Sequence, residues 1–91
     1  MRKEIWKFDV LLLGDFKLTM PWGAKILTFQ MQQDTPRIWV LIDWDVAGNA
    51  RETREFTIQG TGIDFYLDKG NYIGTIQRNN FVWHLFEVFN K

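Results

Sequence analysis

The stretch of sequence that decides the fold class reads Arg37-Ile38-Trp39-Val40-Leu41-Ile42-Asp43. Its interior residues are β-branched, aromatic or aliphatic on both faces of an extended chain, which is typical of a central strand covered on two sides. The segments around it repeatedly alternate apolar and polar residues with a period of two, the pattern of half-buried strands. This stretch therefore predicts a β protein in which residues 37–43 form a central strand.

Six further strands are predicted around this one. They span residues 5–12, 16–20, 25–32, 54–59, 72–77 and 81–89. Turn residues separate them, as in Pro21-Trp22-Gly23 and Arg78-Asn79-Asn80. Residues 63–70 are predicted to form either an irregular loop or a single helical turn. Short strands with a turn roughly every ten residues predict one all-β domain over residues 1–91, a small antiparallel sandwich or barrel of about seven strands.

Alternation within each predicted strand selects the core. We expect the following side chains to be mostly buried: Trp6, Phe8, Leu27, Phe29, Trp39, Leu41, Phe56, Ile58 and Phe86. The chain has eight Phe, five Trp and two Tyr, more aromatic side chains than so small a core needs. The others are expected to line a pocket or an interface, or alternatively to lie singly on the surface. This excess also predicts a homo-oligomer, at least a dimer.

Composition excludes several classes of protein. The chain has eleven Lys and Arg residues and eleven Asp and Glu residues, so its formal net charge is zero. General affinity for duplex nucleic acid normally needs an excess of positive charge, so a duplex nucleic acid is not expected as a partner. The chain has no cysteine, which excludes disulfides, thiolate catalysis and cysteine-based zinc sites and fits a cytoplasmic protein. The apolar run Val10–Leu13 is too short for a signal peptide or a membrane span, so no membrane association is expected.

Six pieces of the chain resemble a family of short, uncharacterised β-rich proteins, a domain of unknown function found in bacteriophage and bacterial genomes. They are Ile5–Phe8, Met20–Leu27, Ile38–Asp43, Phe56–Gly62, Tyr72–Thr75 and Phe81–Glu87. The resemblance covers about half of the chain and implies an origin but no activity. Family members often carry His after Gly-Thr-Gly, where this chain has Ile63, and an acidic or polar residue in place of Trp22.

His84 is the only histidine, and it lies between Val82 and Phe86 on one face of the last predicted strand. A histidine between apolar neighbours is most often a core or interface residue with one satisfied hydrogen bond. A binding role is the second interpretation. Catalysis is the third, because a nucleophile must lie within hydrogen-bond reach and only Thr61 and Thr75 are suggestive hydroxyls.

Other polar motifs each have two interpretations. Asp43 and Asp45 are either solvated acids at a strand end or, with a third carboxylate, ligands of a hard cation. Gly60-Thr61-Gly62 is either a bulge or bend, or a set of backbone amides facing an anion. Four arginines are either solvated or bind a nucleotide together with stacking aromatics: Arg37, Arg51, Arg54 and Arg78. No catalytic residue, metal site or cofactor is predicted.

A partner surface is predicted from aromatics outside the regular strand faces. It consists of Trp22, Trp44, Tyr66 and Tyr72, with Arg37 and Arg78 as charged contacts and His84 as a further binding residue. The alternative is that these aromatics fold back as lids over the open ends of the fold. We expect a non-enzymatic, phage-type protein that binds a host or viral protein through this surface, with counter-defence as one expected role. Its alternatives are an oligomer that sequesters a small anionic ligand such as a signalling nucleotide, and an enzyme or virion component.

Overall fold

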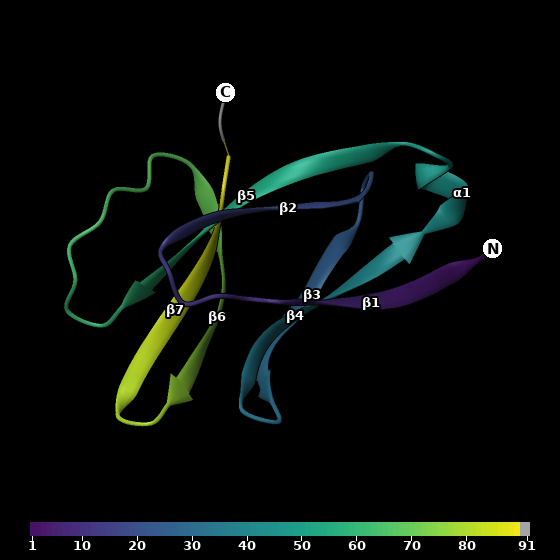
Figure 1. Cartoon of the computed structure of the whole chain (residues 1–91). Helices are drawn as coiled ribbons and strands as arrows, with labels where there is room; N and C mark the ends of the chain where they lie inside the picture. Colours follow the sequence, from purple (N-terminus) through teal and green to yellow (C-terminus); the bar gives the residue numbers. More distant parts are fainter. Residues whose placement is uncertain (90–91) are drawn as a thin grey trace.

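Strand pairing divides the chain into two antiparallel sheets in the computed structural model, which describes residues 1–89 (Figure 1). One sheet has the order β1-β4-β3 and the other β2-β5-β7-β6. The strands are β1 (Lys3–Asp9), β2 (Asp15–Pro21), β3 (Lys25–Gln32), β4 (Thr35–Asp43), β5 (Arg51–Gly60), β6 (Gly70–Arg78) and β7 (Phe81–Val88). The predicted all-β class with seven strands is confirmed, and the described strands form no closed barrel.

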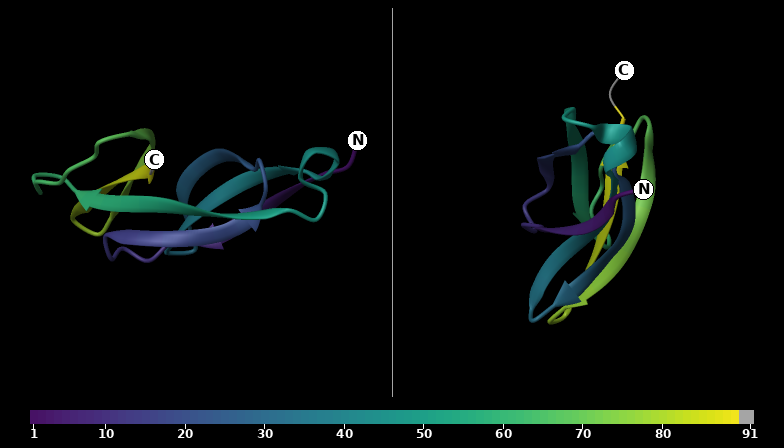
Figure 2. Two further views of the ribbon diagram at one scale, coloured as in Figure 1. Left: turned by 90° about the horizontal axis from the view of Figure 1, so that it is seen from above. Right: turned by 90° about the vertical axis from the view of Figure 1, so that its right-hand side faces the viewer.

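One apolar core lies between the inner faces of the two sheets. Its buried side chains are Val10, Met20, Ala24, Phe29, Ile38, Val40, Ile42, Phe56, Ile58, Ile76 and Leu85. Apart from Val10 and Ala24, which lie in connections, they come from strands of both sheets, as expected when alternate residues of each strand point inward. The Cα trace is flat, with principal extents of 42 × 34 × 16 Å, as the views in Figure 2 show. The core is therefore thin, and both outer sheet faces are large.

Among the side chains predicted to be buried, Leu27 is the one that the structure leaves exposed. Phe29, Phe56 and Ile58 are buried as expected, but Leu27 is 43% exposed. The pairing of β3 with β4 shifts between Ile26 and Thr28, so Leu27 is an extra residue without a pairing partner. Such a bulge reverses the alternation on its N-terminal side, and Ile26 packs against the core instead.

The central strand β4 is confirmed as central, because β1 and β3 pair with its two edges. Its inward residues are Ile38, Val40 and Ile42, all fully buried. Trp39 and Leu41 therefore lie on the outer face, where they are still mostly buried as predicted, although outside the apolar core. Phe86 is half-buried on the outer face of the other sheet for the same reason, whereas Trp6 and Phe8 pack against the core from β1.

A short helix, α1 (Trp44–Ala47), follows β4 and connects it to β5. Asp43 starts it, because one carboxylate oxygen accepts a hydrogen bond from the backbone N–H of Asp45 at 3.0 Å. The other oxygen accepts a hydrogen bond from Lys3 Nζ at 3.1 Å. The helical turn considered for residues 63–70 is absent, and the residues between β5 and β6 form an irregular loop.

Replacing Asp43 with Asn tests the charge of this cap. The Lys3 hydrogen bond is the main cause that lowers the pKa of Asp43 below 3.8. A carboxylate with a lowered folded-state pKa stabilises the protein above its unfolded-state pKa of about 3.9 and loses this effect as the pH falls through the folded-state value. Asp43→Asn keeps a capping side chain, so its urea midpoint should be lower than wild type at pH 7. The difference should disappear in acid, and a pH-independent difference would contradict this account.

Candidate functional site

The outer face of the β2-β5-β7-β6 sheet brings together residues from all four strands. Asp15 of β2 lies opposite Thr57 of β5, Thr57 opposite Phe86 of β7, and Phe86 opposite Tyr72 of β6. These side chains point away from the core because their strand neighbours, such as Leu85, are the buried ones. The row therefore carries polar groups at the β2 side and aromatic rings at the β6 side.

His84 lies in the next row of this face and is hydrogen-bonded at both ring nitrogens. Its Nε2 lies 2.7 Å from Thr61 Oγ1, and its Nδ1 lies 3.0 Å from Thr75 Oγ1. Thr75 Oγ1 is in turn 2.6 Å from the hydroxyl of Tyr72. A hydroxyl can donate or accept, so the two threonines satisfy either tautomer of the ring. His84 thus joins the loop after β5 to β6 through a continuous polar chain.

The distances from His84 to Thr61 and Thr75 resemble those of a hydrolase triad, with Thr61 in the place of the nucleophile, His84 in that of the base and Thr75 in that of the orienting group. The orienting group differs, because Thr75 offers a neutral hydroxyl where such enzymes have a carboxylate. A neutral hydroxyl gives the imidazolium formed during catalysis no charge stabilisation. The same contacts are well suited to holding the start of the loop against the sheet.

The loop of residues 61–69 carries aromatic side chains over this face; it is the green segment at the left of Figure 1. The ring of Phe65 lies 5.3 Å from that of Phe86, and the ring of Tyr72 lies 5.6 Å from the same Phe86 ring. Tyr66, next to Phe65, is 100% exposed. We call Phe65, Tyr66, Tyr72 and Phe86 the aromatic face.

The predicted partner surface is divided by the fold. Tyr66 and Tyr72 belong to the aromatic face, whereas Trp22 lies in the β2–β3 turn, where its backbone N–H bonds to Ala50 O at 3.0 Å. Trp44 lies at the start of α1 and packs edge-on against Trp6, with ring centroids 5.8 Å apart. Trp44 therefore acts as a cover for the core, while Trp22 stays 51% exposed.

The other charged residues of interest have local partners. Arg37 lies 3.2 Å from Asp9 and donates a hydrogen bond to Gln32 at 2.6 Å. Arg78 lies 3.8 Å from Asp34, and Asp45 lies 3.8 Å from the N-terminal amine. Within residues 1–89 no group of three acidic or histidine side chains is placed to hold a metal ion.

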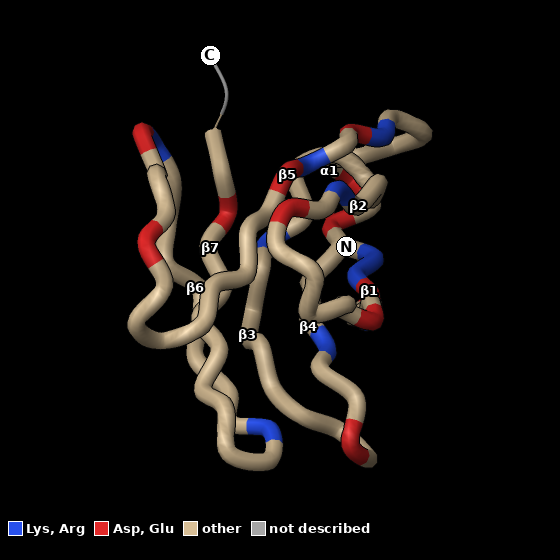
Figure 3. Tube along the Cα trace, turned by 60° about the vertical axis from the view of Figure 1, so that its left-hand side comes forward, with Lys and Arg blue, Asp and Glu red and all other residues tan. Residues whose placement is uncertain are grey.

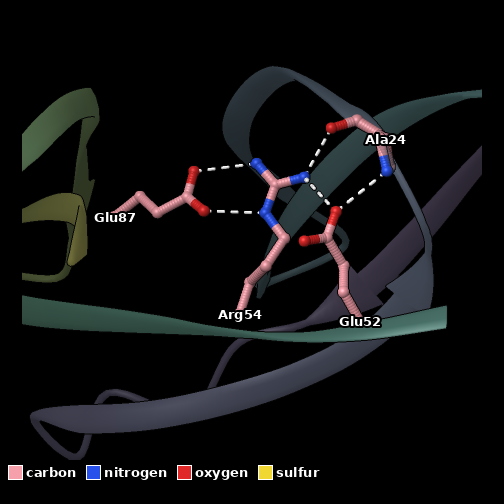
Figure 4. Close-up of polar contacts among 5 residues, drawn as sticks. Ala24, Glu52, Arg54 and Glu87 are labelled. Carbon is pink, nitrogen blue, oxygen red and sulfur yellow. Dashed lines mark hydrogen bonds and ion pairs between the residues drawn. The ribbon is translucent and has the colours of Figure 1, made fainter. Parts of the chain in front are cut away.

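Arg54 is the centre of a part-buried polar cluster that the sequence did not indicate (Figure 4). Its Nε and Nη2 donate to the two carboxylate oxygens of Glu87 at 2.7 and 2.8 Å, and its Nη1 donates to the carbonyl of Ala24. Glu52 lies 3.8 Å from Arg54 and accepts a hydrogen bond from Gly23 N–H at 2.8 Å. The cluster ties β5 and β7 to the turn before β3.

This cluster corrects the expectation that Arg54 is solvated. Its side chain is only 17% exposed, and Glu87 is 7% exposed. Hydrogen bonding by Glu87 raises the pKa of Arg54 above its ordinary value, so the guanidinium stays charged. One signal could have revealed the pair: Glu87 shares a strand face with Trp83 and Leu85, and an acid among core residues needs a cationic partner. Phe65 was also missed, although it adjoins Tyr66.

Comparison with known proteins shows the family. No helix in the part of the chain that the structure describes is long and apolar enough to cross a membrane. No curated protein and no solved structure matches the chain. The model of one family, described as a domain of unknown function, DUF7352, matches residues 1–91. The expected membership of an uncharacterised family is therefore confirmed, and the chain belongs to the DUF7352 family.

Proposed function

We propose that this chain is a non-enzymatic binding protein that contacts a partner protein through the aromatic face. The observation that carries the proposal is the full exposure of Tyr66 beside an anchored neighbour, Phe65. Tyrosine is enriched in protein interfaces because it combines a large apolar area with a polar hydroxyl. Anchoring by Phe86 holds the loop in place before binding and so reduces the entropy that association costs.

Two observations favour a protein partner over the alternatives. The His84 chain lacks a carboxylate that would orient and charge-stabilise the ring, which favours binding over hydrolysis. A cavity of about 460 Å³ between β3 and β6 has Lys25 and Arg54 as its cations, and Arg54 is already bonded to Glu87. This charge balance favours a protein partner over a sequestered small anion or signalling nucleotide.

The setting is part of the same proposal. We place the protein in the cytoplasm of a bacterial cell, as a bacteriophage-type protein that binds a host or viral protein in counter-defence. The resemblance of its motifs to short phage and bacterial proteins supports this setting, and so does the absence of cysteine. Self-association, which the aromatic excess predicts, is included in the proposal.

Tyr66→Ala tests the aromatic face. A partner is first identified by native mass spectrometry of the protein from infected cells, which also reports the oligomeric state, and is then purified. The dissociation constant of the purified pair should rise roughly tenfold or more in Tyr66→Ala, because exposed tyrosines of this kind often dominate binding energy. The melting temperature should stay unchanged, because a fully exposed ring contributes nothing to the core.

Trp22→Ala is the matched control, since Trp22 is also an exposed aromatic residue of a turn but lies outside the aromatic face. It should leave the dissociation constant at the wild-type value. Partner binding that is unchanged in Tyr66→Ala and weakened in Trp22→Ala would contradict the proposal and move the interface to the β2–β3 turn.

A further inference from the structure

A cavity of about 400 Å³ opens beside the aromatic face, between the loop of residues 61–69 and the strands beneath it. Phe65 and Tyr66 line it from the loop, and Asp15, Glu55, Thr57 and Gln59 line it from β2 and β5. Its volume lies within the range of small-molecule and side-chain pockets. Since Phe65 belongs to both, the cavity and the aromatic face are continuous.

The charge in this cavity has one sign. Among the described residues that line it, Asp15 of β2 and Glu55 of β5 are the only side chains charged at neutral pH, and both are acidic. Among the described residues, the only ion pair of Glu55 is with Lys17, at 3.9 Å, and the Lys17 side chain is 65% exposed. Asp15 has no ion pair within residues 1–89. The two carboxylates therefore face the cavity with little neutralisation.

The surrounding chain adds to this negative potential. The loop of residues 61–69 carries Asp64 and Asp68 against the single cation Lys69, and Figure 3 shows the charged positions of this segment along the trace. Two acids against one base give this loop, which lines one side of the cavity, a net negative charge. An anion is thus disfavoured in this cavity, in contrast to the mixed charge of the cavity between β3 and β6.

The uncharged groups of the cavity also suit a cation with several N–H donors. Gln59 Nε2 donates to Thr57 Oγ1 at 2.7 Å, which leaves the Gln59 carbonyl oxygen as a free acceptor among the described groups. Together with Asp15 and Glu55, it offers acceptor oxygens from two strands. The rings of Phe65 and Tyr66 add the π faces that attract ammonium and guanidinium groups.

We propose that this cavity binds the guanidinium group of an arginine side chain from the partner protein. A guanidinium matches the cavity in charge, in its many donors and in its ability to stack on aromatic rings. The continuity of the cavity with the aromatic face places this arginine in the same interface, so the inference rests on the proposed function. It assigns the partner a surface arginine that enters between Tyr66 and the Asp15–Glu55 pair.

N-acetyl-arginine amide is the probe that tests the cavity. Its binding to the full chain is monitored by the backbone amide NMR signals. Titration at millimolar concentrations should give saturable shifts at Thr57, Gln59 and Tyr66, and these should weaken at high salt. N-acetyl-citrulline amide has the same shape without the charge and should give no saturable shifts. Saturation by citrulline amide at the same concentrations would overturn the proposal.

One double variant separates the effect of the two carboxylates on probe binding from any effect on folding. Asp15→Asn with Glu55→Gln keeps the shape of both side chains and should weaken binding of the arginine probe roughly tenfold, while the amide spectrum remains that of a folded protein.

Spermidine is the competing ligand: if it binds more tightly than the arginine probe, the cavity is a polyamine site and the arginine assignment is wrong.

The purified partner then distinguishes this inference from the proposed function. The double variant should weaken partner binding, as Tyr66→Ala does. If Tyr66→Ala abolishes partner binding and the double variant leaves it unchanged, the arginine assignment fails while the aromatic face stands. If neither change affects partner binding, both proposals fail.

Discussion

Replacement of Arg54 by methionine is expected to lower the free energy of unfolding by about 3–5 kcal/mol, because it leaves the buried carboxylate of Glu87 without a partner. Methionine fills part of the volume of the arginine stem, so the loss reports the missing charge and hydrogen bonds. Chemical denaturation followed by tryptophan fluorescence measures it. Arg51→Met is the matched control, because Arg51 is exposed on the same strand, and its effect should stay within about 0.5 kcal/mol.

A double variant checks the physical reason. Arg54→Met combined with Glu87→Met removes both charges, and apolar pairs in place of buried ion pairs are often neutral or stabilising. Most of the lost stability should therefore return. A double variant less stable than Arg54→Met alone would show that the Glu87 carboxylate stabilises the fold through some contact other than Arg54.

Phe29→Ala is expected to have the second large effect, a loss of about 3–5 kcal/mol. Phe29 is 4% exposed on β3, and Gly74 of β6 approaches its Cβ closely enough that an added methyl group would touch it at 3.4 Å. The ring therefore packs where the edges of the two sheets meet, and its removal leaves a cavity that a thin core cannot close. The denaturation midpoint measures the loss.

Leu27→Ala provides the control on the same strand. Simple alternation places Leu27 and Phe29 on one face, but the bulge turns Leu27 outward. Its replacement should cost no more than about 0.5 kcal/mol, as for other surface positions. Equal losses in the two variants would mean that the bulge is absent and that the simple alternation of β3 is correct.

The strands were predictable wherever alternating apolar and polar residues, or turn residues, mark them within a few neighbouring positions. β3 spans the predicted residues 25–32, and Asn79 has the positive φ of 57° that its place in a tight turn suggests. β5 is longer than expected, because Arg51, Glu52 and Thr53 pair with β2 despite being polar. A ladder of backbone hydrogen bonds does not require apolar side chains, so residue composition underestimates the length of this strand. β1 ends at Asp9, earlier than predicted.

The candidate site was predictable only in part. Tyr66, Tyr72 and His84 were selected from their residue types and from the loop position of Tyr66. Their assembly was not, because a sequence pattern does not show which strands pair. Trp22 and Trp44 were selected by the same reasoning, yet the fold places them in the β2–β3 turn and at α1.

The sequence by itself determined the all-β class, the seven strands and the central position of residues 37–43, because alternation and turn residues act over a few neighbours. Only the tertiary structure decided which face of β4 is buried, since both of its faces are apolar and pairing chooses between them. It also decided the polar contacts: His84 meets Thr61 across 23 positions, and Arg54 meets Glu87 across 33. Such contacts depend on strand order and register, which are set when the two sheets bury their shared core.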